Sequence, residues 1–371
     1  MSSALFSPIT LRKLTLANRI VVSPMCQYSA RDGSANDWHL MHLGQFSVAG
    51  PGLVIMEATA VEPRGRITYG DLGLYSDDNE AALARIVAFF REYGEAKLGI
   101  QLAHAGRKAS DHLPWEEHGR PLAPDEGAWA TLGPSAMSYG EAWPPPQALD
   151  LEGLSAVKQA FVESTRRAAR LDFDLVELHA AHGYLLHEFL SPLSNQRTDN
   201  YGGNLENRMR FPLEVFAALR AVWPEAKPLG VRISATDYAE GGWSVEDSLV
   251  FAAALQARGC DYIDVSGGGL VPWQTLAVGP GYQVPFAARI RQEVRIITMA
   301  VGMINQASQA EEIIARGQAD LVALARGMLY DPRWTWHAAE ELWVDLEYPP
   351  QYRRCHPSRW PQAFPHRQAV E

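Results

Sequence analysis

The fold prediction starts from the stretch Phe173-Asp174-Leu175-Val176-Glu177-Leu178-His179-Ala180-Ala181-His182-Gly183-Tyr184. Its first six residues are a mostly apolar run of the length of a buried strand. Two histidines three residues apart, a glycine and a tyrosine follow where this strand gives way to a loop. Imidazole and phenol groups hold oxygen atoms and transfer protons, and loops at strand ends commonly present such groups. Taken alone, the histidines could equally be ordinary core or surface residues.

Short apolar strands of this kind recur along the chain, with helical patterns between most of them. The eight predicted strands cover residues 20–22, 53–59, 97–102, 173–178, 229–233, 262–266, 296–300 and 320–327. Apolar strands that alternate with helices indicate a parallel sheet covered on its outer face, and eight such units predict an α/β fold, the (β/α)₈ TIM barrel. An open doubly wound sheet would normally carry a glycine-rich turn after its first strand. The segment Ser23-Pro24-Met25-Cys26 is no such turn.

The chain is expected to form one domain over residues 1–371, with a single interruption of the alternation. Residues 110–148, after the third strand, contain many prolines together with Trp115, Trp129 and Trp143. A loop of this length in a compact protein is usually functional or disordered, and its aromatic content favours an ordered lid over the barrel mouth.

Two helix starts are predicted from capping patterns. Ser244 with Asp247 resembles a capping box for a helix that ends at Gly259. Ser308 with Glu311 is expected to cap a second helix, which ends at Gly317.

The composition limits the class of protein. The 371 residues are 47% hydrophobic and 20% charged, with a formal net charge of −10. No run of Lys and Arg indicates a nucleic-acid or membrane surface, and no signal peptide or membrane-length apolar run is found. The three cysteines at positions 26, 260 and 355 form neither a zinc pattern nor a disulfide framework. We expect a soluble, cytoplasmic protein.

In a barrel of this type the active site lies at the carboxyl ends of the strands. Arg232 and Arg326, with glycines at 302 and 327, suit a phosphate held near the last two strands. The Gln101 side chain can both donate and accept hydrogen bonds, which suits a flat heterocycle. The pattern alone therefore predicts a phosphorylated ligand. The residues at the predicted strand ends are Cys26, Tyr28, Ala58, Gln101, His179, His182, Tyr184, Arg232, Ser266, Gly302 and Arg326.

Several longer motifs in a fixed order are similar to those of the Old Yellow Enzyme family. The motifs are Ser23–Tyr28, Glu57–Val61, Gln101–Lys108, His179–Leu185 and Phe189–Gly203, continuing to Glu206-Asn207-Arg208. The resemblance covers nearly all of residues 4–354. The pair Cys26 and Tyr28 resembles the thermophilic-like branch, which includes bacterial NADPH dehydrogenases and xenobiotic reductases.

The resemblance implies a TIM barrel that binds FMN without a covalent link and uses NADPH to reduce activated C=C bonds of unsaturated carbonyl or nitro compounds. It implies that hydride comes from flavin N5 and the proton from Tyr184. His179 and His182 are expected to hold the substrate oxygen, and Tyr28 to help bind the substrate. The residues expected to line the flavin are Ser23, Pro24, Met25, Cys26, Ala58, Gln101, Arg232, Ser266, Gly302, Ala325 and Arg326.

Other interpretations remain open at this level. A metal-dependent TIM-barrel hydrolase could use His179 and His182, but no carboxylate or cysteine stands at a persuasive third position. A Schiff-base aldolase would need a lysine at a strand end, and the sixth strand ends in Ser266. A non-catalytic flavin-binding barrel is hard to reconcile with a placed tyrosine acid. Cys26 could be an inert thiol or could touch the flavin, and Lys108 could lie at the surface or near it.

The chain departs from the family pattern at three places. The eighth strand reads Ala325-Arg326 where the family commonly has Gly-Arg, and the 110–148 loop is longer than in the shorter members. The segment Pro349–Arg354 resembles one that inserts an arginine into a neighbouring subunit's active site, but here the chain continues for 17 more residues, to Glu371. Arg354 is expected to play that role in a homodimer or homotetramer. This tail, residues 349–371, is expected at a subunit interface.

Overall fold

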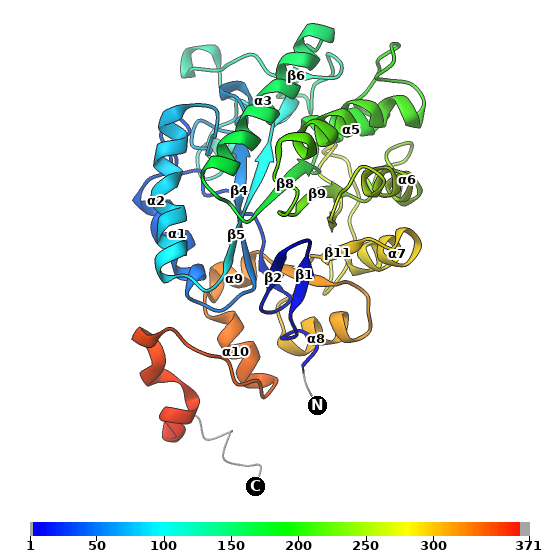
Figure 1. Ribbon diagram of the computed structural model, residues 1–371. Coiled ribbons are helices and arrows are strands. Elements are labelled where there is room, and N and C mark those ends of the chain that lie inside the picture. The colour runs from blue at the N-terminus through cyan, green and yellow to red at the C-terminus, as the bar shows by residue number, and fades with distance from the viewer. Residues whose placement is uncertain (1–2, 364–371) are drawn as a thin grey trace.

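The computed structural model describes residues 3–363, in which eight parallel strands close into a barrel (Figure 1). The order around the barrel is β10-β11-β12-β3-β4-β5-β8-β9, with each strand paired in parallel to its neighbours. This confirms the predicted TIM barrel and all eight predicted strands. The strands are β3 (Ile20–Val22), β4 (Leu53–Ala60), β5 (Lys97–Ala103), β8 (Leu175–Ala180), β9 (Leu229–Ser234), β10 (Tyr262–Ser266), β11 (Ile297–Ala300) and β12 (Leu321–Leu324).

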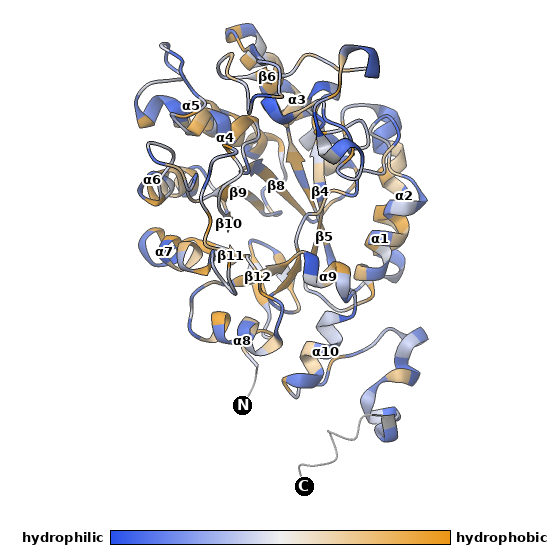
Figure 2. Cartoon of the chain, turned by 180° about the vertical axis from the view of Figure 1, so that it is seen from behind, coloured by the Kyte–Doolittle hydropathy of each residue, from blue (hydrophilic) through white to orange (hydrophobic). Residues whose placement is uncertain are grey.

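Helices surround the barrel, and Figure 2 shows their apolar residues gathered toward the strands. On α3 (Leu151–Arg170), for example, the apolar stripe made of Leu154, Val157, Phe161 and Ala168 is entirely buried. None of the described helices is long and apolar enough to cross a membrane. The helices are α1 (Asp37–Ser47), α2 (Asp77–Tyr93), α3 (Leu151–Arg170), α4 (Leu185–Leu190), α5 (Leu205–Val222), α6 (Val245–Gln256), α7 (Val284–Val294), α8 (Ala307–Ala315), α9 (Arg326–Tyr330) and α10 (Trp334–Glu341).

The barrel interior changes from apolar to polar along its axis. An N-terminal hairpin, β1 (Ile9–Leu11) and β2 (Leu14–Leu16), packs its leucines with the first inward residues of the strands, among them Leu53 and Leu175. Because side chains alternate along a strand, the next inward residues on β8 are Glu177 and His179. The hairpin therefore closes the amino end of the barrel, and the polar residues face the opposite end.

Residues 110–148 adopt a defined conformation that includes the short parallel pair β6 (Leu132–Gly133) and β7 (Gln147–Ala148). The Trp143 indole N–H donates to Asp111, and the Arg107 guanidinium donates to the carbonyl of Met137. The first bond lies within the segment, and the second attaches the segment to the loop after β5. Its predicted function as a lid stays a prediction.

The two capping predictions have different outcomes. Ser244 and Asp247 form the predicted capping box at α6. The prediction for Ser308 and Glu311 was wrong, because α8 begins at Ala307 without a side-chain cap. The Glu311 carboxylate instead accepts hydrogen bonds from the N-terminal segment, at 2.7 Å from Ala4 N and 2.8 Å from Leu5 N.

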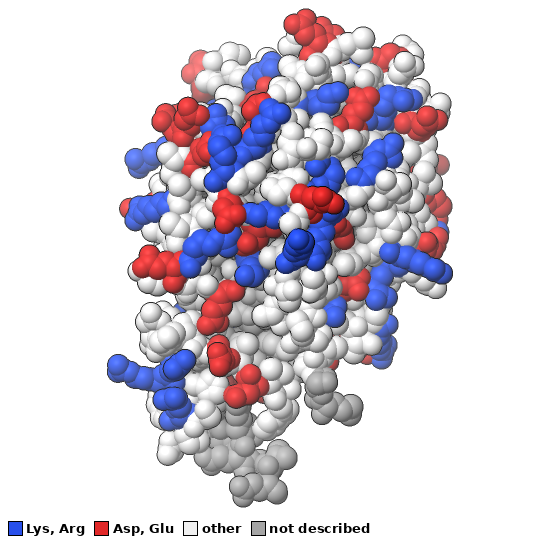
Figure 3. All heavy atoms as spheres, in the orientation of Figure 1, with Lys and Arg blue, Asp and Glu red and all other residues white. Residues whose placement is uncertain are grey.

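Charged side chains of both signs are interspersed on the face shown in Figure 3. Many of them form ion pairs between neighbouring helices. Arg167 on α3, for example, contacts both Asp77 and Glu80 on α2 at 2.7 Å.

Candidate active site

A cavity of about 940 Å³ opens at the carboxyl ends of the strands. Seven of the predicted site residues line it: Ser23, His182, Arg232, Ser266, Gly302, Ala325 and Arg326. The sequence did not single out several others, including Gly267, Gly269, Gln274, Tyr282, Gln283, Met303, Asn305 and Tyr330. Most of these belong to the loops after β10 and β11, whose sequences carry no strong chemical pattern.

A hydrogen-bonded chain connects the two histidines to Ser266. The N–H of Ala181 donates to His179 Nδ1 at 3.2 Å, so the ring proton of a neutral His179 lies on Nε2. His179 Nε2 lies 3.2 Å from His182 Nδ1, and His182 Nε2 lies 2.8 Å from Ser266 Oγ. Because the Ser266 hydroxyl donates to the carbonyl of Ile233, it accepts from His182. Each imidazole N–H is therefore directed at a protein partner.

Both histidines are neutral at physiological pH. Burial lowers the pKa of His179 and of His182 well below the usual value, and the positive charge of Arg232 lowers both further. A neutral imidazole has one N–H donor and one acceptor nitrogen, which is what the chain of bonds requires.

Tyr184 lines a small hollow together with Ala58 and Asp71, separate from the main cavity. Its ring centroid is 5.0 Å from that of His179. Burial has the largest effect on Tyr184 and raises its pKa well above the usual value, and the nearby Tyr28 raises that pKa further. The phenol therefore keeps its proton at neutral pH.

Lys108 lies in the site rather than at the surface. Its ammonium donates to the carbonyls of His182 at 2.9 Å and Gly269 at 3.0 Å, and lies 5.1 Å from the ring centre of Tyr184. Burial lowers the pKa of Lys108 to about 8. The sequence left its position open because a lysine after a strand carries no signal of its direction.

Cys26 and Tyr28 follow β3 on the same rim, above two buried carboxyl groups. Burial raises the pKa of the Cys26 thiol well above its usual value, and Asp71 and Glu57 raise it further. The thiol is therefore protonated. Tyr28 has a left-handed backbone, with φ of 49°, and its ring lies 6.2 Å from that of Trp115 in the 110–148 segment.

A polar network fills the barrel below the cavity. Gln101 Nε2 donates to Glu177 at 2.7 Å, and the hydroxyl of Tyr262 donates to the same carboxyl at 3.0 Å. Arg232 lies 3.2 Å from Asp264 and donates to Ser23 Oγ at 3.0 Å. Glu177 and Asp264 were not among the predicted site residues, although an acidic residue within an apolar strand is itself a signal.

The other predicted residues lie around the two hollows. Gln101 is 2% exposed and lies behind the cavity, bonded to Glu177. His179 is 4% exposed and contacts the cavity residue His182. Pro24, Met25 and Cys26 continue from β3 without lining either hollow. Met25 packs against the main core.

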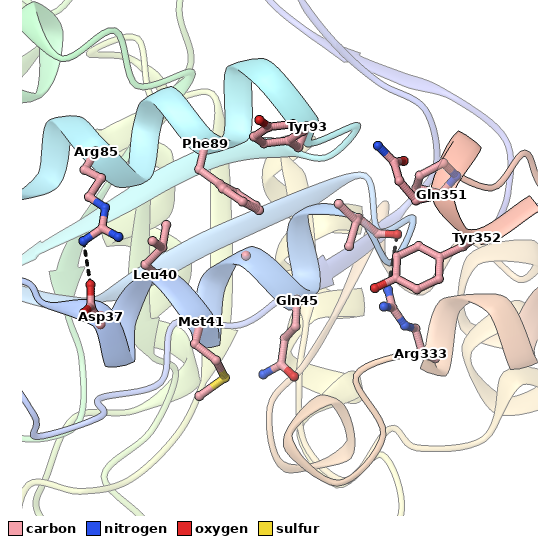
Figure 4. A pocket seen from close by; sticks show the side chains of 13 residues that line it. Asp37, Leu40, Met41, Gln45, Arg85, Phe89, Tyr93, Arg333, Gln351 and Tyr352 are labelled. Atoms are coloured by element: carbon pink, nitrogen blue, oxygen red, sulfur yellow. Dashed lines mark hydrogen bonds and ion pairs between the residues drawn. The ribbon is translucent and has the colours of Figure 1, made fainter.

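Arg354 is exposed and lines neither hollow. It belongs to a 3₁₀ helix, Pro350–Cys355, whose Tyr352 ring lies 5.7 Å from that of Trp336 on α10. Tyr352 from this segment lies over Arg333, and both residues border a groove of about 520 Å³ along α1 and α2 (Figure 4). Residues 364–371 of the predicted tail lie outside the described residues.

Residues 4–344 match the model of the NADH:flavin oxidoreductase / NADH oxidase family. The chain is 46% identical over 356 residues to an NADPH dehydrogenase of Geobacillus thermodenitrificans, covering 95% of this chain and 99% of that protein. The chain belongs to the Old Yellow Enzyme family. An NADPH dehydrogenase of Bacillus subtilis is 44% identical over the same shares of the two chains.

A solved structure titled morphinone reductase superposes on this Old Yellow Enzyme homologue with a TM-score of 0.76 and 26% identity, covering 94% of this chain and 92% of that one. A second, titled morphinone reductase in complex with tetrahydroNAD, has a TM-score of 0.75 and 27% identity over 93% and 92% of the two chains. The protein is an NAD(P)H-dependent FMN oxidoreductase.

The cavity residues fit FMN. Among residues 3–363, no carboxylate or carbonyl pairs with the exposed Arg326 guanidinium, which leaves a cation available for a phosphate. Gly302 has a φ of +113°, and a Cβ there would lie 2.8 Å from Gln283 Nε2, so this wall needs glycine. Arg232, Ser23 and Ser266 supply polar groups deeper in the cavity.

A metal site at His179 and His182 would need at least one further ligand. Within residues 3–363, no group of three or more His, Cys, Asp or Glu side chains is arranged to hold a metal ion.

Proposed function

We propose that this enzyme is an ene-reductase that acts on α,β-unsaturated carbonyl or nitro compounds. The observation that supports this most directly is the position of a protonated phenol: the ring of Tyr184 lies 5.0 Å from that of His179, whose partner His182 lines the cavity that fits FMN. FMN, when bound, supplies the hydride that it has taken from NADPH. The protein supplies orientation, hydrogen bonds and the proton.

In this proposal His179 and His182 hold the substrate oxygen, on which charge builds during reduction. Their N–H groups now have protein partners, so the substrate oxygen would replace one of them, with Ser266 as the simplest partner for His182 to release. The His182 N–H would exchange its hydrogen bond to Ser266 for one to the substrate oxygen, so the number of neutral hydrogen bonds is unchanged and the free-energy cost of the exchange is small. Loss of one such donor costs about 3–4 kcal/mol of transition-state stabilisation in comparable sites.

Tyr184 donates the proton to the substrate α-carbon. Its raised pKa keeps it protonated across the physiological range. The neighbouring Lys108 ammonium lies over the phenol ring and would stabilise negative charge as the proton leaves.

The test separates the two half-reactions of the FMN-loaded enzyme. NADPH should bleach the visible flavin spectrum under anaerobic conditions, and 2-cyclohexenone should then restore it. Tyr184→Phe should slow the recolouring by about a hundredfold or more and leave bleaching nearly unchanged. Tyr201→Phe, which removes a phenol outside the cavity, serves as the control. If Tyr184→Phe slowed bleaching and recolouring equally, the role of Tyr184 as the proton donor would be refuted.

Two further proposals concern the surroundings of the site. Arg354, exposed on the C-terminal segment, reaches the substrate of a neighbouring subunit in a homo-oligomer. Residues 110–148, through Trp115 beside Tyr28, cover part of the barrel mouth. The enzyme is proposed to work in the cytoplasm, where its nicotinamide reductant is available.

A further inference from the structure

The turn that carries Tyr184 has a constrained backbone. His182 and Gly183 are consecutive left-handed residues, with φ of +59° and +76°. A Cβ at Gly183 would lie 2.2 Å from the carbonyl oxygen of Gly269, so the turn packs directly on the loop after β10. The direction of the Tyr184 side chain depends on how this turn is held.

Two side chains hold the turn through its main chain. Lys108 binds the carbonyl of His182 from the cavity side, at 2.9 Å. From beneath, the imidazole of His187 on α4 accepts the N–H of Gly183 at its Nδ1, also at 2.9 Å. The reaction proposed above uses no group of His187, although this residue touches the turn directly.

His187 is oriented by a buried carboxylate. Because Nδ1 accepts a hydrogen bond, the proton of a neutral His187 lies on Nε2, which is 2.9 Å from Oδ1 of Asp237. Both side chains are completely buried. Asp237 Oδ2 accepts from the hydroxyl of Ser191 at 2.6 Å and from the N–H of Trp243 at 2.7 Å. Asp237 is therefore fixed in place from its other side.

The carboxylate of Asp237 keeps its negative charge inside the protein. Burial acts to raise its pKa, but His187, Ser191 and the Trp243 N–H outweigh burial and lower that pKa. The negative charge of Asp237, 2.9 Å from His187 Nε2, favours the His187 tautomer with its proton on that nitrogen. That tautomer is the one whose Nδ1 can accept from Gly183.

We propose that His187 and Asp237 are positioning residues for Tyr184: Asp237 selects the His187 tautomer, and His187 holds the Gly183 N–H and thereby the direction of the phenol. The inference rests on the proposed role of Tyr184 as proton donor. A pair with only a structural role would change stability or slow both half-reactions alike. A positioning pair slows the step that uses the Tyr184 proton.

The test uses the FMN-loaded enzyme and the two-phase assay with NADPH and 2-cyclohexenone. His187→Leu removes the acceptor, and His187→Asn keeps an acceptor close to the position of Nδ1. Asp237→Asn presents an amide N–H to His187 Nε2, which moves the ring proton to Nδ1 and opposes the Gly183 N–H. His42→Leu, on α1, controls for the loss of a buried imidazole away from the turn.

We expect His187→Leu and Asp237→Asn each to slow recolouring by about tenfold to a hundredfold, with bleaching changed by no more than about twofold. His187→Asn should restore most of the wild-type rate. In a Tyr184→Phe background, His187→Leu should have no further effect on recolouring, because the group that it positions is gone.

Three results would overturn the inference: equal slowing of both phases, a His187→Asn variant as slow as His187→Leu, or an undiminished effect in the Tyr184→Phe background. If His187→Leu fails to bind FMN, Asp237→Asn decides by the same criteria. A Tyr184→Phe single variant that recolours at the wild-type rate would refute the proposed function instead, so the two failures are distinguishable.

Discussion

Replacing Glu57 by glutamine should make the stability of the enzyme less sensitive to pH. Glu57 is 4% exposed, and burial raises its pKa from 4.5 to about 8 against the opposing effect of the Gln27 N–H. His39 lies 3.6 Å away, but burial lowers the pKa of His39 to about 4, so it brings no compensating charge at neutral pH.

The sign and size of the effect follow from the proton that the folded protein retains. Between pH 4.5 and about 8 the unfolded chain has released the Glu57 proton and the folded protein has not, so the stability contributed by Glu57 falls as pH rises through this range. A shift of this size corresponds to about 5 kcal/mol at most, or about 6 °C in Tm for a chain of this length. Because glutamine does not titrate, the Glu57→Gln variant should not lose this part of its stability as the pH rises.

Thermal denaturation of the FMN-loaded enzyme between pH 5 and pH 8.5 measures the effect. The Tm of Glu57→Gln minus that of the wild type should become more positive as pH rises. Glu62→Gln is the opposite control: burial acts to raise the pKa of Glu62, but His104 and Arg64 outweigh it, so ionised Glu62 stabilises the fold above pH 4.5. Its Tm difference from the wild type should be negative and nearly constant between pH 5 and pH 8.5, because the contribution of Glu62 is already complete above pH 4.5. Parallel pH profiles for wild type and Glu57→Gln would refute the reasoning.

Two further predictions concern the ligand sites. Gly302→Ala places a methyl group 2.8 Å from Gln283 Nε2 at a φ of +113°, so FMN should bind at least about tenfold more weakly in a fluorescence titration of the apoprotein. Unchanged FMN affinity would show that the wall at Gly302 does not border the flavin. Arg354→Ala should raise KM for 2-cyclohexenone severalfold without affecting NADPH bleaching, whereas the neighbouring Arg353→Ala should not, and light scattering should show an oligomer. If Arg354→Ala kept the wild-type KM, the proposal that Arg354 contacts the substrate would be refuted.

Local sequence predicted the barrel because its signals are short-range. A strand is recognisable from about five consecutive apolar residues, and a helix from spacing such as that of Leu154, Val157 and Phe161, which are all buried on α3. The capping box at Ser244 is also local, and it formed as predicted. The prediction from the similar pattern at Ser308 was wrong, because the Glu311 carboxylate accepts hydrogen bonds from Ala4 and Leu5, which are distant in the sequence.

The chemistry of the site was predictable in its parts. Because all the strands are parallel, the residue at each carboxyl end had to reach the same rim, and Ser23, Arg232, Gly302 and Arg326 do line one cavity there. The position of Glu177 in the site could not be predicted, because its hydrogen-bond partner Gln101 is 76 residues away in the sequence and the two meet only when the barrel closes.

By itself, then, the sequence determined the number and order of the strands, the rim on which polar groups gather, and the family. Only the tertiary structure decided the direction of each group: that Lys108 points into the site, that His179 and His182 donate to protein partners, and that His187 holds the Gly183 turn. The physical reason is that periodicity specifies which face of a strand or helix a residue occupies. The partner of a hydrogen bond is specified by three-dimensional closure, which brings separate loops within 3 Å of one another.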